Sequence, residues 1–163
     1  MGKTNAIRLV EQGQIPYREA YYPFDESDLS GLHAAEAIGL PPEQVFKTLV
    51  ARGERTGIAV FCIPVCCGLD LKKAARATGD KKVELVHVKE LLSLTGYIRG
   101  GCSPIGMKKP FPTFFHISVL QHSVIYISAG VRGLQIRIAP QDLLRFVGGE
   151  TAEISRPSSV AAE

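Results

Sequence analysis

Apolar positions along the chain follow helical spacing in some segments and strand spacing in others. Ile7 and Val10 lie three residues apart, as on one face of a helix, and Gly13 follows the pattern, so a helix is expected over residues 4–12. Ser30 and Asp70 are typical helix N-caps, and each opens a segment that runs to a glycine. This pattern predicts helices over 30–39 and 70–77. Shorter helical segments are expected after Pro41, over 90–94 and over 142–146.

The strand-like segments are short and rich in β-branched and aromatic residues. Residues 46–52 and 58–65 flank a glycine-bounded turn, which predicts a β-hairpin. Further strands are expected at residues 17–22, 83–86, 113–117, 124–128 and 134–138. Helices and strands intermix without the regular alternation of a doubly wound sheet, so the sequence predicts an α+β fold. One domain over residues 1–155 is expected, with a tail at 156–163.

Composition narrows the class of protein. The 163 residues are 45% hydrophobic and 21% charged, which is typical of a globular domain. No apolar run approaches the ~20 residues of a membrane span, and residues 1–5 lack the apolar segment of a secretory signal. We therefore expect a cytoplasmic protein without a membrane partner. The four cysteines (Cys62, Cys66, Cys67 and Cys102) are expected to be reduced thiols.

Charge alone does not indicate a nucleic-acid partner, because the formal net charge is only +3. Its distribution is uneven, with basic residues gathered in two segments. These residues are Lys72, Lys73, Arg76, Lys81, Lys82 and Lys89 in the first segment, and Lys108 and Lys109 in the second. A solvated face and a phosphate-contacting surface both explain such clusters.

Lys47 is the first candidate for chemistry. It lies near the start of the expected strand over residues 46–52, and strand alternation places it on the same face as Leu49. If that face lines a cleft, the ammonium group can meet an anion or a carbonyl oxygen there. A strand-end lysine that points to solvent is the alternative.

A glycine-rich loop and a glycine-containing turn are the next candidates. Gly100 and Gly101 open an irregular segment that also contains Ser103, and paired glycines let backbone N–H groups approach an anion or a carbonyl under attack. Ser128 and Arg132 border the turn between the last two expected strands, where binding groups often lie. Tyr22 could reach a ligand with its phenol. Ordinary turns and a half-buried tyrosine explain the same residues structurally.

Several reaction classes have no support in the sequence. The histidines are scattered without metal-ligand spacing, so neither a metal site nor a cofactor is expected. The segment at Gly100 lacks the lysine and hydroxyl spacing of a phosphate-binding loop. Cys102 is a possible nucleophile, but no histidine is identifiable as its base.

Four stretches in this order resemble the YbaK/EbsC-like aminoacyl-tRNA deacylases, a family similar to the editing domain inserted in bacterial prolyl-tRNA synthetases. The resemblance covers residues 4–154. The stretches are residues 42–49 (PEQVFKTL), 69–73 (LDLKK), 95–109 (TGYIRGGCSPIGMKK) and 125–134 (IYISAGVRGL).

The resemblance implies roles for individual residues. It places the family's essential lysine on Lys47, its Gly-Gly-x-Ser-Pro loop on residues 100–104, its strand-end serine on Ser128 and a pocket tyrosine on Tyr22. Deacylases of this type carry an acidic residue after Arg-Gly-Leu, whereas this chain has Gln135. That departure leaves open which amino acid is preferred.

The resemblance also implies an architecture and an activity. The expected fold is a mixed, strongly curved, partly barrel-like sheet with flanking helices. The expected activity is deacylation in trans of mischarged tRNA, with Cys-tRNA(Pro) as substrate and a prolyl-tRNA synthetase as a possible second partner. In the family mechanism the substrate's own thiol attacks its carbonyl. A non-catalytic tRNA-end or nucleotide-binding module and a hydrolase of small esters remain alternatives.

Overall fold

The α-helices begin and end within about two residues of where the sequence predicts them, whereas the 3-10 helix over residues 117–121 was not predicted. The computed structural model describes residues 3–157. Its helices are α1 (Asn5–Gln12), α2 (Gly31–Ile38), α3 (Leu71–Thr78), α4 (Val88–Thr95), α5 (Pro140–Val147), and the 3-10 helices η1 (Pro42–Gln44) and η2 (Ile117–Gln121). The side chains of Thr4, Ser30 and Asp70 each accept a hydrogen bond from a backbone N–H in the first turn of α1, α2 and α3. The N-caps predicted at Ser30 and Asp70 are therefore confirmed, and Thr4 caps α1 in the same way.

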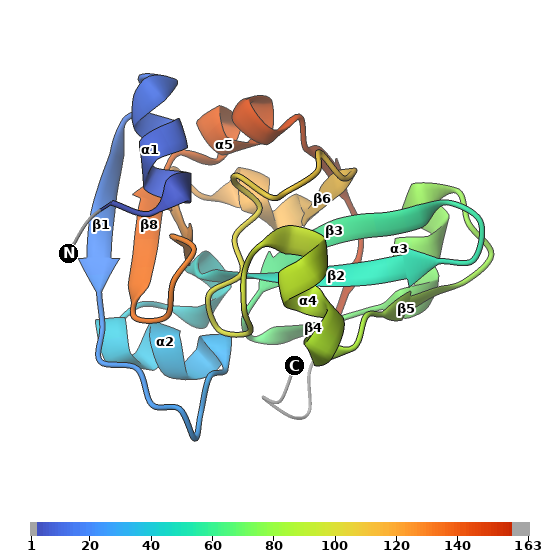
Figure 1. The fold of residues 1–163 in the computed structure, drawn as a ribbon, viewed down its shortest axis with the longest axis horizontal. Coiled ribbons are helices and arrows are strands. Elements are labelled where there is room, and N and C mark those ends of the chain that lie inside the picture. Colours follow the sequence, from blue (N-terminus) through green and yellow to red (C-terminus); the bar gives the residue numbers. More distant parts are fainter. Residues whose placement is uncertain (1–2, 158–163) are drawn as a thin grey trace.

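The strands form three sheets (Figure 1). The largest has the order β5-β2-β3-β6-β9, the second β1-β8-β7, and the third β10-β4. Their bounds are β1 (Tyr17–Tyr21), β2 (Phe46–Gly53), β3 (Gly57–Pro64), β4 (Cys67–Leu69), β5 (Val83–Leu85), β6 (Thr113–His116), β7 (Ile125–Ser128), β8 (Leu134–Ile138), β9 (Glu150–Ala152) and β10 (Ser155–Pro157). In the largest sheet β2 is antiparallel to β3 and β5, whereas β6 is parallel to β3 and β9.

The two faces of β3 belong to two different hydrophobic clusters. Val60 and Cys62 pack in the larger cluster, together with residues of β7, β8, α1 and α5. Phe61 and its neighbours on the other face pack in a second cluster that includes Ala74 and Ala75 of α3. Strand alternation thus places one layer on each side of the hairpin. Figure 1 shows α4 in front of this hairpin and α3 behind it.

The expectation of an α+β fold with a mixed sheet is confirmed, but the expectation of a strongly curved, partly barrel-like sheet is wrong. The described strands divide among three separate sheets and none of these sheets closes. Short strands β4, β9 and β10, with no more than three residues each, were not predicted. Strand β10 pairs with β4 through Pro157, two residues into the expected tail; the rest of that tail lies outside the described residues.

Within residues 3–157, none of the helices has the length and apolar character needed to cross a bilayer.

Candidate functional site

A cavity of about 430 Å³ lies beside one edge of β2. Strand β3 pairs with the whole length of β2, but β5 pairs with it only over residues 51–53. The five residues from Phe46 to Val50 all line the cavity. Because an open strand edge presents backbone groups together with side chains of both faces, consecutive residues can contribute to the same wall. Lys47 lies in this wall and is partly buried.

Five of the eight residues predicted for the site line this one cavity: Tyr22, Lys47, Gly100, Ser128 and Gln135. They come from distant parts of the chain that pairing brings together. Ser128 and Gln135 are register partners in the β7–β8 pair. Tyr22 follows β1, and its N–H donates to the carbonyl of Gly133 at 3.0 Å.

Gly101, Ser103 and Arg132 support the cavity wall without lining it. The N–H of Gly101 donates to the Ile98 carbonyl at 2.9 Å, and a Cβ on Gly101 would lie 3.0 Å from the backbone of Val131. Ser103 is fully buried and its Oγ accepts a hydrogen bond from the N–H of Ile105. Arg132 Nε donates to the Arg99 carbonyl at 2.9 Å. These contacts join the glycine loop to the β7–β8 turn.

Gly100 needs the conformation that only glycine adopts readily. Its φ is +85°, in the left-handed region. A Cβ there would also meet Leu29 at 3.3 Å and Arg132 Cγ at 3.4 Å. Gly100 therefore lets the loop turn sharply at the cavity wall, where it lies between Leu29, which precedes α2, and Arg132 of the β7–β8 turn.

Tyr97 stabilises the same loop, although no role was predicted for it from the sequence. Its hydroxyl donates to the Ile105 carbonyl. Its ring lies so close to Gly130 that a Cβ there would be 2.8 Å from Cε1. Burial raises the pKa of Tyr97 to about 12, so the phenol remains a hydrogen-bond donor at neutral pH. The available signal was an aromatic residue inside an otherwise polar and glycine-rich segment.

The charged groups around the cavity are cationic. Lys47 and Arg99 line it, together with His87. Among the described lining residues there is no aspartate or glutamate. No role was predicted for Arg99 or His87. Arg99 lies within the stretch over residues 95–109 without an assigned role, and His87 lies outside the four stretches. The cavity is therefore suited to a ligand that carries phosphate or another anionic group.

The thiols near the cavity are not activated. Cys102 lines it and is buried, and burial raises the pKa of Cys102 to about 12. Burial likewise raises the pKa of Cys62 to about 12. Since the thiolate is the nucleophilic form, Cys102 is a poor nucleophile at neutral pH. All four cysteines are free.

Gln135 carries an orphan polar atom inside the site. The residue is 6% exposed and lines the cavity. Among the buried side-chain oxygen and nitrogen atoms of residues 3–157, Gln135 Oε1 is the one without a hydrogen-bond partner. A buried carbonyl without a donor costs about 1–3 kcal/mol. A ligand that brings an N–H or O–H donor to this atom would recover that free energy.

No grouping of three or more histidine, cysteine, aspartate or glutamate side chains occurs among the described residues in an arrangement that could hold a metal ion.

Comparison with known proteins identifies the family of the chain. Residues 32–146 match the aminoacyl-tRNA editing domain family. A protein of Enterococcus faecalis (strain ATCC 700802 / V583) named "Putative Cys-tRNA(Pro)/Cys-tRNA(Cys) deacylase EbsC" is 51% identical over 153 residues, which cover 94% of this chain and 93% of that protein.

Solved structures share the fold. The crystal structure of "a putative trans-editing enzyme for prolyl tRNA synthetase" matches with a TM-score of 0.78 and 26% identity, covering 95% of this chain and 99% of that one. The crystal structure of a hypothetical protein matches with a TM-score of 0.83 and 20% identity, covering 92% and 98%. The domain match covers residues 32–146, and the Enterococcus faecalis relative is 51% identical. The chain therefore belongs to the aminoacyl-tRNA editing domain family.

Proposed function

We propose that the protein is a trans-acting deacylase that removes cysteine from mischarged tRNA(Pro). Membership of the editing family supports an aminoacyl-tRNA substrate, and the name of the Enterococcus faecalis relative supports cysteine as the amino acid. The observation that carries the proposal is the meeting of Lys47 and Gly100 in the wall of one cavity. Its volume of about 430 Å³ is within the ~300–1,000 Å³ range of small-ligand sites. A prolyl-tRNA synthetase would supply the mischarged tRNA.

The substrate bond determines how much catalysis is needed. An amino acid esterified to a ribose hydroxyl is already activated, so positioning and charge stabilisation can suffice. In this proposal the Lys47 ammonium binds the terminal adenosine's phosphate or ribose, or the ester carbonyl. The N–H of Gly100 stabilises the developing oxyanion. We assign that role to Gly100 alone, because the N–H of Gly101 already donates to Ile98.

The nucleophile in this mechanism belongs to the substrate. The cysteinyl sulfur attacks the ester carbonyl carbon and loses its proton, the bond from that carbon to the ribose oxygen breaks, and the ribose oxygen takes up a proton. The products are free tRNA and a cyclic thioester. The raised pKa of Cys102 supports this scheme, since the nearest protein thiol remains protonated at neutral pH.

Gln135 would bind the amino-acid end of the substrate. Its unpartnered Oε1 can accept a hydrogen bond from the α-ammonium group of the esterified amino acid. A neutral amide binds an ammonium more weakly than the carboxylate of related deacylases would. Recognition of the amino acid in this chain therefore depends more on the shape of the cavity and on the reactivity of the substrate thiol.

A panel of mischarged tRNAs tests the proposal. We expect the purified protein to release cysteine from Cys-tRNA(Pro), and we expect S-methylcysteinyl-tRNA(Pro), which lacks the nucleophile, to be stable. Absence of release from every member, with tRNA binding retained, would identify a non-catalytic tRNA-end module. Cleavage of small esters at a rate insensitive to the tRNA body and to salt would identify a general hydrolase instead.

A further inference from the structure

Three aliphatic side chains form an exposed strip that begins in the cavity wall and continues outside it. Leu85 of β5 and Val88 of α4 line the cavity and are 41% and 61% exposed, and Leu92 is 54% exposed. Val88 and Leu92 are four residues apart in α4, so they lie on the same helix face. We call Leu85, Val88 and Leu92 the α4 strip. Exposed apolar residues that continue a ligand cavity indicate a surface that contacts a ligand.

The helix that carries the α4 strip is tied to β2 at its N-terminal end and capped at its C-terminal end. Arg52 of β2 forms an ion pair with Glu90 at 2.9 Å, and the other oxygen of Glu90 accepts the N–H of His87 at 3.1 Å. At the far end, Gly96 adopts the left-handed conformation and closes the helix. Because α4 is fixed to the strand that carries Lys47, the strip and the cavity keep one relative position.

The charges around the strip fit a polyanion. The carboxylate of Glu90 is paired with Arg52, whereas Lys89 beside the strip is an exposed cation. Lys108 Nζ lies 3.5 Å from the carbonyl oxygen of Ser93, a residue of α4. Arg99 lines the adjoining cavity. Sites for single-stranded nucleic acid combine cations that contact phosphates with side chains that pack on the faces of bases, and here the strip offers aliphatic side chains for that packing.

We propose that the α4 strip holds the nucleotide that precedes the terminal adenosine of tRNA. This inference rests on the proposed function, and it adds the direction of approach: the single-stranded 3′ end leaves the cavity over α4. The size of the strip favours a nucleobase over a protein partner. A stable protein interface buries about 800 Å² on each side, far more than three aliphatic side chains provide. One base face matches them in extent and in polarity.

The first experiment compares two substrates and two leucines. Leu92→Gln keeps the helix-forming tendency but removes the apolar surface. Leu120→Gln is the matched control, because Leu120 is 53% exposed and lies on η2, away from the cavity-lining residues. We expect Leu92→Gln to lower kcat/KM for Cys-tRNA(Pro) about fivefold through KM. Hydrolysis of cysteinyl-adenosine, which lacks the preceding nucleotide, should be unchanged, and Leu120→Gln should match the wild type with both substrates.

The second experiment needs no catalysis. An uncharged oligonucleotide that ends in CCA is titrated against the protein by fluorescence anisotropy, alongside the same strand with an abasic site before the terminal adenosine. In the wild type, loss of the base should weaken binding about fivefold; in Leu92→Gln the two strands should bind equally. This result without deacylation would keep the strip and reject the proposed function. If the wild type deacylates Cys-tRNA(Pro) and Leu92→Gln matches it in both kcat/KM and oligonucleotide binding, the role of the α4 strip is rejected and the proposed function stands.

Self-association is the remaining outcome to exclude. If the α4 strip joined two copies of the chain, the wild type would sediment as a dimer and Leu92→Gln as a monomer. That result would overturn the assignment to a nucleotide. We expect the same sedimentation coefficient for both proteins.

Discussion

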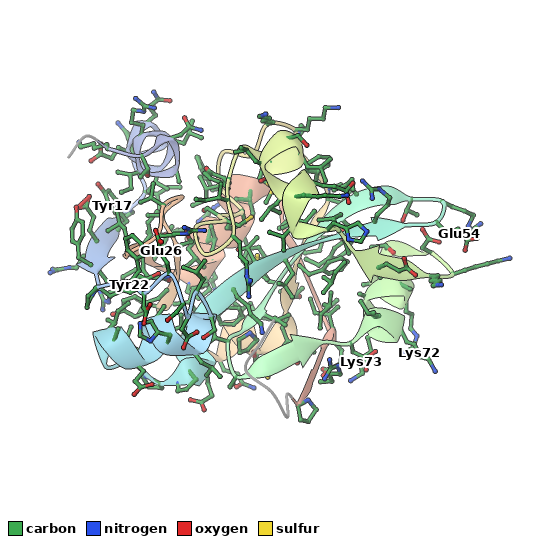
Figure 2. All side chains as sticks on the ribbon, turned by 60° about the horizontal axis from the view of Figure 1, so that its bottom comes forward. Tyr17, Tyr22, Glu26, Glu54, Lys72 and Lys73 are labelled. Carbon is green, nitrogen blue, oxygen red and sulfur yellow. The ribbon has the colours of Figure 1, made fainter. Side chains whose placement is uncertain are left out.

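Two basic regions of the molecule differ in what surrounds their cations. On and beside α3, lysines are exposed or meet surface partners: Lys82 pairs with Glu84 at 3.1 Å and Lys73 lies 3.9 Å from Glu153. In the cavity, Lys47 is partly buried and shares the wall with Arg99 and Gly100. Figure 2 shows Lys72 and Lys73 at one end of the molecule and Tyr22, which lines the cavity, at the other.

The difference shows that the number of cations in a segment does not locate a site. An exposed ion pair contributes only about 0–1 kcal/mol, and salt screens it. A charge in a cavity interacts more strongly with a ligand, because less water screens it. Within the basic segment, Lys72 and Arg76 are thus exposed on α3, whereas the single lysine of β2 lines the cavity.

Replacing one lysine in each region gives the largest expected contrast. Lys47→Ala should lower kcat/KM for Cys-tRNA(Pro) by about 100-fold or more, because it removes charge stabilisation inside the cavity. Lys72→Ala should stay within about twofold of the wild type, since Lys72 is exposed on α3. Deacylation rates with each purified variant, together with circular dichroism spectra, check both statements. Equal losses in the two variants would remove the distinction between the regions.

A pair of glycine substitutions extends the contrast to the backbone. In Gly101→Ala the new Cβ would lie 3.0 Å from two backbone atoms of Val131, which must shift. We expect a loss of about 1–3 kcal/mol in the free energy of unfolding. Deacylation should fall about tenfold or more, because the Gly100 N–H moves with the loop.

The control for Gly101→Ala is Gly79→Ala at the end of α3. Gly79 has φ +78°, and a Cβ there would have no atom within 4 Å. Its replacement should cost about 1–2 kcal/mol of backbone strain and leave kcat/KM unchanged. Urea unfolding and deacylation assays on both variants test this. If Gly79→Ala lost as much activity as Gly101→Ala for the same loss of stability, the expectation would be wrong.

The sequence predicted local features of the fold better than long-range ones. The caps at Thr4, Ser30 and Asp70 depend on a few adjacent residues, so their helices were located correctly. The pairing of β4 with β10 joins residues far apart in the chain, and each strand has only three residues, too few for a periodic signal. The partly barrel-like sheet was expected from resemblance, and the division of the strands into three sheets depends on pairings that no local pattern specifies.

The same distinction applies to the site. Lys47 and Gly100 belong to recognisable stretches, and the structure places both at the cavity. Gly101, Ser103 and Arg132 belong to those stretches too, but their contacts stay within the protein, which a motif cannot reveal. Arg99 belongs to the stretch over residues 95–109 and His87 to none of the four, and for both residues the position at the cavity was learned from the fold. Motifs therefore predicted which loops form the site, and packing determined which residues of each loop face it.

Replacement of Gln135 by leucine is expected to have a smaller effect on activity, and to raise stability while it weakens substrate binding. Gln135→Leu removes the unpartnered Oε1 and keeps a similar volume, so the free energy of unfolding should rise by about 1 kcal/mol. The KM for Cys-tRNA(Pro) should rise about fivefold, because the α-ammonium loses its acceptor. Gln135→Glu should lower KM below the wild-type value, since a carboxylate accepts a stronger hydrogen bond from a cation. Unchanged KM in both variants would show that the amide does not contact the substrate.

The smallest effect is expected at Cys102, although it lies in the cavity. Burial raises its pKa from the ordinary value of 9.0 to about 12, so the folded state holds the proton more tightly than the unfolded state does. The resulting stabilisation is fully present below pH 9.0 and is lost as the pH rises toward about 12. Cys102→Ala should therefore change kcat less than about threefold and make the alkaline decline of the melting temperature shallower. A hundredfold loss of kcat in a folded Cys102→Ala variant would make this thiol the nucleophile and would transfer the chemistry from the substrate to the protein.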